Sequence, residues 1–220
     1  MIDDPDCTNS TIRLLVFQAL QKLDTKSIFE LLYDEDYIVR SAAARELQIR
    51  GEEWTFKKLQ NLVADPIPYV REISAFTLGQ LGTPTYPFKK QSIPLLKKML
   101  FDDDPDVRAA AVAAFGHLGT YDISCFIEDQ LIAMISDESE EVRESLAYTL
   151  GSSSGSEKVI EALTFLLNDN SEGVRSWAAT SIELLEDKKS REIISKNREF
   201  SWYFLFEKIN SGAFKLQMHR

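Results

Sequence analysis

The chain contains two histidines and two cysteines in 220 residues, which limits the chemistry it can perform. With only His117 and the penultimate His219, a catalytic triad or a zinc site has almost no candidate ligands. Cys7 and Cys125 are too few to form a disulfide framework. We therefore predict no catalytic residue, no metal and no cofactor, and a protein that is not an enzyme.

Long hydrophobic runs are also missing. No stretch approaches the ~18 apolar residues that a membrane span needs. The first residues, MIDDPDCTNSTIRLLVF, are acidic and lack the basic start and long apolar stretch of a secretion signal. We therefore expect a cytoplasmic protein that does not enter a membrane. Its hydrophobic content of 44% is enough for a folded core.

One motif recurs along the chain: an aspartate, four residues of any kind, and then Val-Arg. Subtracting successive arginine numbers gives steps of 31, 37, 35 and 32 residues. The aspartate and arginine pairs are Asp34 and Arg40, Asp65 and Arg71, Asp102 and Arg108, Asp137 and Arg143, and Asp169 and Arg175. Because a catalytic site occurs once and a structural device recurs, this spacing indicates a repeat protein.

Apolar residues surround each motif at helical spacing. Two and three positions before each aspartate stand apolar pairs such as Leu31-Leu32, where an amphipathic helix would end. The residues four and seven positions after the arginine are Ala44 and Leu47, Ala75 and Leu78, Val112 and Phe115, Ala147 and Leu150, and Ala179 and Ile182. Together with the preceding valine they form one stripe of a helix. Each unit is therefore predicted to be helix, short acidic turn, helix.

The most acidic turn, DDDPDVR at 102–108, could be a metal site or a helix start. A calcium loop needs a glycine turn and a distal glutamate in fixed register, and this stretch has neither. Carboxylates at a helix N-terminus accept unpaired backbone N–H groups, a contact worth about 0.5–2 kcal/mol. Pro66, Pro68 and Pro105 suit the same position because proline lacks an N–H. We interpret these turns as helix starts.

Residues 25–187 resemble HEAT repeats, close to the short bacterial kind first noticed in phycobilin lyases. The resemblance implies an all-α fold, a right-handed α-solenoid of about five helical hairpins in one domain, residues 1–220. Residues 1–24 would cap its N-terminus. The aromatic, basic segment 188–220 would cap its C-terminus or pack against a partner. The family also implies that the five aspartates and arginines form a hydrogen-bonded ladder, and that the second helices line a concave face.

The charge is distributed unevenly. Residues 102–144 hold twelve carboxylates and two arginines, a net charge of −10, which equals that of the whole chain. Residues 188–220 have a net charge of +5. An acidic middle disfavours nucleic acid, which requires clustered Lys and Arg, although the basic segment keeps that alternative open. It favours a cationic protein partner, steered to the surface by charge.

Positions one, two and five after each arginine fall off the buried stripe and are predicted to contact a partner. Aromatic anchors with charged neighbours are typical of interface hot spots. An aromatic residue on a helix can equally belong to the core, and for Phe76 and Trp177 both interpretations stay open. The predicted partner-binding residues are Glu72, Phe76, Glu144, Tyr148 and Trp177 from these positions, and Asp103, Asp106, Glu140 and Glu141 from the acidic segment 102–144.

A more specific resemblance is found in ARELQIRG at 44–51, AFTLGQLG at 75–82 and VRSWAA at 174–179. These strings are similar to those of HEAT-repeat immunity proteins encoded beside Rhs and contact-dependent growth inhibition toxins. The resemblance implies stoichiometric binding to a toxin, with the cationic C-terminal domain of a cognate toxin as the partner. A general scaffold or regulatory adaptor is the alternative, and a DNA glycosylase or bilin lyase is a third, disfavoured one.

Overall fold

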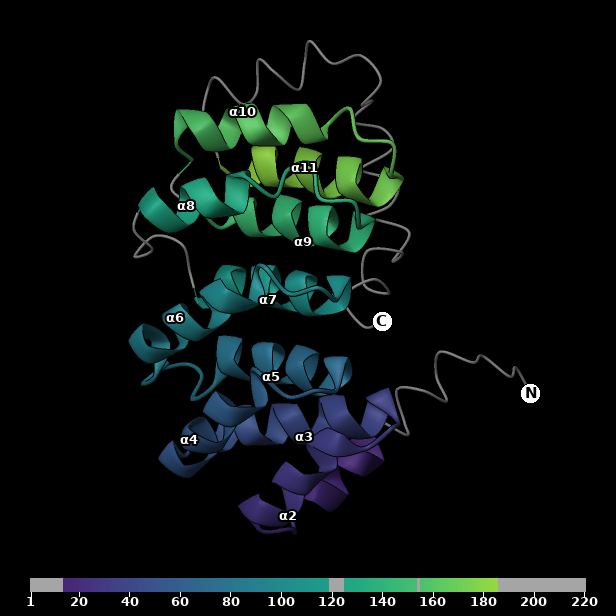
Figure 1. Ribbon diagram of the computed structural model, residues 1–220, viewed down its shortest axis with the longest axis vertical. Helices are drawn as coiled ribbons and strands as arrows, with labels where there is room; N and C mark the ends of the chain where they lie inside the picture. The colour runs from purple at the N-terminus through teal and green to yellow at the C-terminus, as the bar shows by residue number, and fades with distance from the viewer. Residues whose placement is uncertain (1–13, 119–124, 154, 186–220) are drawn as a thin grey trace, which may run out of the picture. The chain divides into compact units, whose positions relative to one another are not determined.

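The computed structural model describes residues 14–118, 125–153 and 155–185 (Figure 1). Within these ranges the fold is all-α, with helical hairpins stacked as in an α-solenoid and no strand. The chain divides into two compact units, residues 1–119 and 120–220, which are described separately below. The proposed C-terminal cap at 188–220 lies outside the described residues, and the single-domain organisation stays a prediction.

The first unit contains three helical hairpins. Residues 14–20 are helical at its N-terminal end, where the sequence predicts a cap. The elements that follow are α2 (Thr25–Glu30) with the 3-10 turn η1 (Leu31–Tyr33), α3 (Tyr37–Arg50), α4 (Glu53–Leu62), α5 (Pro68–Gln80), α6 (Lys89–Met99) and α7 (Pro105–Leu118). The second helices α3, α5 and α7 pack side by side, and each contacts the first helix of its own hairpin.

The second unit contains two hairpins. Its helices are α8 (Cys125–Ile132), α9 (Glu140–Gly151), α10 (Glu157–Leu166) and α11 (Glu172–Leu184). The second helices α9 and α11 pack against each other, and α10 contacts α8, α9 and α11. The predicted order of helix, acidic turn and helix is therefore confirmed in both units.

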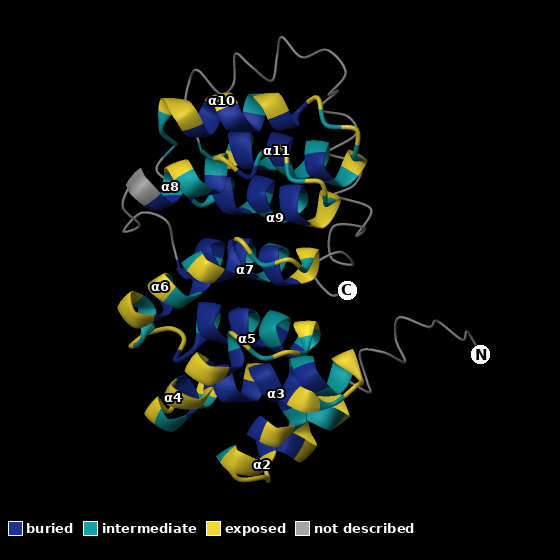
Figure 2. Cartoon of the chain, in the orientation of Figure 1, coloured by how far each residue is buried: buried dark blue, intermediate teal, exposed yellow. Residues whose placement is uncertain are grey.

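The repeated apolar stripe forms the core. Every residue predicted four or seven positions after an arginine is buried, at 1% exposure or less. The valine before the arginine is also buried in four repeats, whereas Val39 in the first is half-buried. The second helices carry most of the dark blue residues in Figure 2. Burying a valine, leucine, isoleucine or phenylalanine of this stripe contributes about 1.5–3 kcal/mol, so the repeated stripe stabilises each hairpin.

Small residues let the second helices approach closely. A Cβ atom placed on Gly79 of α5 would lie 2.7 Å from the Cβ of Ala114 in α7. In the second unit, a Cβ on Gly151 of α9 would collide with Ser181 Oγ of α11. Ser181 uses this proximity, because its hydroxyl donates a buried 2.7 Å hydrogen bond to the carbonyl oxygen of Ala147. Larger side chains at these positions would separate the helices.

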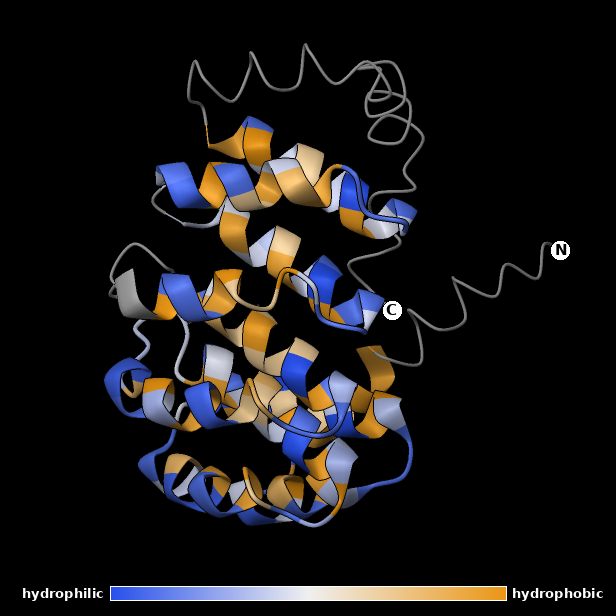
Figure 3. Cartoon of the chain, turned by 45° about the horizontal axis from the view of Figure 1, so that its top comes forward, coloured by the Kyte–Doolittle hydropathy of each residue, from blue (hydrophilic) through white to orange (hydrophobic). Residues whose placement is uncertain are grey.

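The acidic turns begin the second helices, as predicted. Each repeated aspartate accepts a hydrogen bond from the backbone N–H two residues later, so the same turn occurs in all five repeats. The third residue of the turn then precedes the helix. Asp36, Asp104 and Ser139 there accept backbone N–H groups of the first helical turn. Pro68 and Pro105 are the first residues of α5 and α7. The turns are mainly hydrophilic (Figure 3).

Candidate binding surface on the second helices

The repeated arginine first closes its own turn. In all five repeats its Nη1 atom donates to the carbonyl oxygen of the repeated aspartate, at 2.6–2.9 Å, and to that of the next residue. Sequence reasoning assigned the arginines to contacts between repeats and missed this local role. The signal was present in the constant spacing of six residues between aspartate and arginine.

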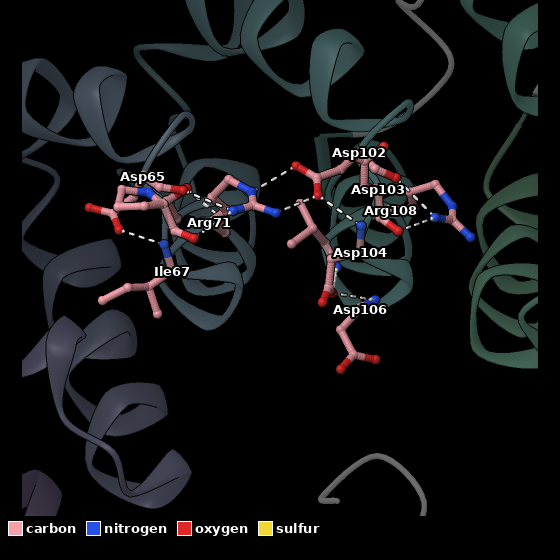
Figure 4. A network of polar contacts seen from close by, with 11 residues as sticks. Asp65, Ile67, Arg71, Asp102, Asp103, Asp104, Asp106 and Arg108 are labelled. Atoms are coloured by element: carbon pink, nitrogen blue, oxygen red, sulfur yellow. Dashed lines mark hydrogen bonds and ion pairs between the residues drawn. The ribbon is translucent and has the colours of Figure 1, made fainter.

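The other edge of the guanidinium reaches the next repeat in both units. Arg71 donates from Nε and Nη2 to the two carboxylate oxygens of Asp102, at 2.8 and 2.7 Å (Figure 4). Arg143 contacts Asp169 in the same way, at 2.7 and 3.1 Å. Burial alone would raise the pKa of Asp102, but the hydrogen bonds from Arg71 and from a backbone N–H hold it below its usual value. These two contacts are the rungs of the proposed ladder.

Arg40 does not make the corresponding contact, which corrects the expectation of an unbroken ladder. Its guanidinium lies over the ring of Tyr69, 4.4 Å from the centroid, and its buried Nε atom has no hydrogen-bond partner. Asp65 instead accepts the hydroxyl of Tyr33, at 3.1 Å. The reason is local: Tyr33 hydrogen-bonds to Asp65, and Tyr69 gives Arg40 a cation–π contact in place of the ion pair.

The predicted contact positions are mostly half-buried. Phe76, Tyr148 and Trp177 all have intermediate exposure, so each packs on its neighbours and keeps part of its ring accessible. Two other positions on this face were predicted wrongly, because Ala42 and Ile73 are buried at 7% and 2% exposure. In the central repeat, Ala109, Ala110 and Ala113 are half-buried.

In the second unit, three predicted residues come together between α9 and α11. The indole N–H of Trp177 donates to Glu144 Oε1 at 3.0 Å, and the rings of Tyr148 and Trp177 meet edge to face, with centroids 5.0 Å apart. Glu144 Oε2 lies over Gly173, where an added Cβ would be 2.9 Å away. We call Glu144, Tyr148, Trp177 and Gly173 the Glu144 corner. Burial raises the pKa of Glu144, and the indole hydrogen bond opposes the rise.

The first unit has a glutamate at the same repeat position but a different setting. Glu72 also follows the repeated arginine, and Phe76 stands where Tyr148 does, with the guanidinium of Arg45 5.8 Å from its centroid. The positions of Trp177 and Gly173 are occupied by Ala110 and Asp106. Burial and the negative charge of Asp106 raise the pKa of Glu72 to about 7. The charge of Glu72 is thus less stabilised than that of Glu144.

Four other predicted carboxylates lie at helix N-termini. Asp103 and Asp106 are exposed at the start of α7, and Glu140 and Glu141 are exposed at the start of α9. Glu141 accepts the hydroxyl of Ser139, which lowers its pKa. These residues present negative charge to solvent, as a surface that attracts cationic partners requires.

Catalytic and metal-binding features are few in this part of the chain. No group of three His, Cys, Asp or Glu residues among the described positions is arranged to hold a metal ion. His117 is half-buried, and burial with the nearby charge of Arg45 lowers its pKa. No helix in the described ranges is long and apolar enough to span a membrane.

Comparison with known families gives one repeat type. The family model for HEAT repeats matches residues 25–100, 57–126 and 93–183 in overlapping segments. Together these segments cover the region in which the five aspartate and arginine motifs occur. The fold that they describe is typical of non-enzymatic scaffolds, and it agrees with the hairpins seen in both units.

Individual relatives agree with this result. The chain is 28% identical over 174 residues to Protein YibA of Escherichia coli K12, a match that covers 77% of this chain and 61% of YibA. It therefore spans less than two thirds of that relative. The X-ray structure of YibA superposes with a TM-score of 0.68 at 24% identity, covering 81% of this chain and 66% of YibA. A designed armadillo repeat protein in complex with the peptide (KR)4 superposes with a TM-score of 0.54 at 19% identity, covering 87% and 98%.

Proposed function

The chain belongs to the HEAT-repeat family, and from that premise we propose that it is a non-enzymatic protein-binding module. More specifically, we propose an immunity protein that acts in the bacterial cytoplasm. It binds the cationic C-terminal domain of a cognate toxin, of the Rhs or contact-dependent inhibition type, and blocks it by occupying its surface. The observation that carries the proposal is the combination of exposed carboxylates and half-buried aromatic residues on the second helices.

The charge distribution supports a cationic partner. The exposed carboxylates at the starts of α7 and α9 belong to the segment 102–144, which holds the entire net charge of the chain. Charge of one sign speeds encounter with a partner of opposite sign and opposes docking of the wrong one. Toxin domains that attack nucleic acid need positive surfaces to hold phosphates. An acidic inhibitor would compete for those surfaces.

The comparisons support binding in a general way. A designed repeat protein of similar fold forms a complex with the alternating Lys-Arg peptide (KR)4, so this architecture can bind a cationic chain. The more specific part of the proposal rests only on the resemblance of ARELQIRG, AFTLGQLG and VRSWAA to strings of HEAT-repeat immunity proteins.

Association kinetics test the role of charge. We expect the variant with Asp103, Asp106, Glu140 and Glu141 all changed to Lys to associate with the toxin domain at least about tenfold more slowly at low salt. The fold should be retained because all four side chains are exposed, although each lysine at a helix N-terminus should lower stability by about 0.3–1 kcal/mol. Stopped-flow rates that match the wild type, with the same salt dependence, would contradict electrostatic steering.

Calorimetric titration with the toxin domain encoded beside the gene tests the partner itself. Tight one-to-one binding would support the immunity function. Absence of heat at two temperatures would favour the general scaffold or adaptor, for which the same fold is suited.

A further inference from the structure

The Glu144 corner has the features of a receptor for one cationic side chain. A carboxylate and two aromatic rings from α9 and α11 meet within hydrogen-bonding and ring-contact distance. The carboxylate is held in place, because the indole N–H fixes one oxygen and the missing side chain of Gly173 leaves room for the other. All three side chains are half-buried, so they are partly shielded from water and remain accessible.

We propose that this corner binds an arginine side chain presented by the protein partner. The inference rests on the proposed protein-binding function and names the chemistry of one contact within it. A guanidinium can pair with Glu144 through its N–H groups and lie on an aromatic ring with its planar face. Lysine would also be attracted, but its compact ammonium does not stack on a ring as a guanidinium does.

Electrostatics favour a cation here over other ligands. Glu140 and Glu141 stand one turn before Glu144 on α9 and add negative charge. An anion would be repelled by all three carboxylates. A purely apolar side chain would cover the half-buried carboxylate without pairing it, which is unfavourable because the carboxylate loses water and gains no partner. A guanidinium both covers the aromatic surface and pairs the charge.

The equivalent position in the first unit lacks this arrangement. Asp106 and Ala110 stand where Gly173 and Trp177 do, so no indole holds the carboxylate of Glu72. Arg45, from the same chain, already lies near Phe76. We therefore expect a single arginine site, in the second unit.

The test uses the full chain and the peptide (KR)4, titrated by calorimetry at low salt. Glu144→Gln removes the charge but keeps an acceptor for the indole, and Gly173→Ala displaces the carboxylate. We expect each to weaken binding about five- to tenfold, which corresponds to a cation contact of roughly 1 kcal/mol or more. The matched control is Glu161→Gln, which removes one exposed charge from α10 of the same unit and should weaken binding less than about twofold.

A second probe separates arginine recognition from diffuse attraction. Replacing the arginines of the peptide with citrulline, which is neutral and of the same shape, should abolish the difference between wild type and Glu144→Gln. If Glu144→Gln and Glu161→Gln weaken binding equally, or if the wild type does not bind (KR)4, the arginine site is wrong. That result leaves the proposed function standing, since the latter fails only when the toxin domain itself does not bind.

Discussion

Glu72 and Glu144 occupy the same position in two repeats, and burial raises the pKa of both, but only Glu144 accepts an indole hydrogen bond that opposes the rise. In the first unit, Glu72 is close to Asp106 and has a pKa of about 7, so near neutral pH it is ionised in only part of the molecules. In the second unit, Glu144 accepts a hydrogen bond from Trp177 that opposes the effect of burial.

The difference shows how a repeat protein acquires a specific site. The repeat fixes where the backbone places a residue, and the neighbouring repeat determines what that residue can do. The repeat after Glu144 has Trp177 and Gly173 where the repeat after Glu72 has Ala110 and Asp106. These two differences distinguish the positioned carboxylate of Glu144 from the poorly stabilised carboxylate of Glu72. Substitutions made in both units can separate the shared framework from the local chemistry.

The largest effects should come from the shared framework and should be equal in the two units. Arg71→Ala and Arg143→Ala each remove two hydrogen bonds to a turn and a paired contact with an aspartate. We expect each to lower the free energy of unfolding by about 3 kcal/mol, because a partly buried carboxylate loses its partner. Chemical denaturation measures this loss. The exposed Arg45 provides a control, since Arg45→Ala should cost less than about 1 kcal/mol.

The two glutamates should differ in how their substitution depends on pH. Because the folded pKa of Glu72 exceeds the value of 4.5 expected in the unfolded chain, the wild type loses stability as pH rises from about 4.5 to 7. Glu72→Gln avoids this loss and should be more stable than the wild type by about 2 kcal/mol at pH 8, with little difference at pH 4.

Glu144→Gln should change the free energy of unfolding by less than about 1 kcal/mol at pH 8, because glutamine can still accept the indole hydrogen bond. Urea unfolding of Glu72→Gln and Glu144→Gln between pH 4 and pH 8 measures how each substitution changes the free energy of unfolding. An equal pH dependence in the two variants would show that Trp177 does not distinguish the two positions.

The smallest expected difference in stability is between the alanine variants of two glycines, Gly79 and Gly173. Gly79→Ala would bring a methyl group 2.8 Å from the backbone Cα of Ala114, and we expect it to cost about 1–3 kcal/mol. Gly173→Ala meets only the end of the flexible Glu144 side chain and should change stability by about 1 kcal/mol or less in either direction. Thermal unfolding measures both, and a large loss for Gly173→Ala would mean that the Glu144 carboxylate cannot move.

Repeated features could be predicted from the sequence because five copies of one pattern support each other. The buried stripe through Ala75 and Leu78, and the helix starts at Pro68 and Pro105, follow from spacing and from the chemistry of helix ends. Val39, in the first repeat, is the exception on the stripe because it is only half-buried.

Features that depend on one particular neighbour were not predictable. The bond between Trp177 and Glu144 joins residues 33 positions apart and depends on side-chain rotamers. The sequence does not show whether the guanidinium of Arg40 pairs with Asp65 or lies on Tyr69, since these two residues are only four positions apart. The raised pKa of Glu72 likewise follows from how closely α7 packs against α5, which the periodicity alone does not specify.

The rungs between repeats have an evolutionary consequence. In the contacts Arg71–Asp102 and Arg143–Asp169, one hairpin supplies the donor and the next supplies the acceptor. A duplicated hairpin therefore carries both an arginine donor for the next hairpin and an aspartate acceptor for the preceding one. The array can lengthen or shorten by whole hairpins while these contacts between neighbours are kept. The Glu144 corner is inherited differently: it exists only while two specific hairpins stay adjacent, so recombination that preserves the scaffold can erase or create a recognition site in one step.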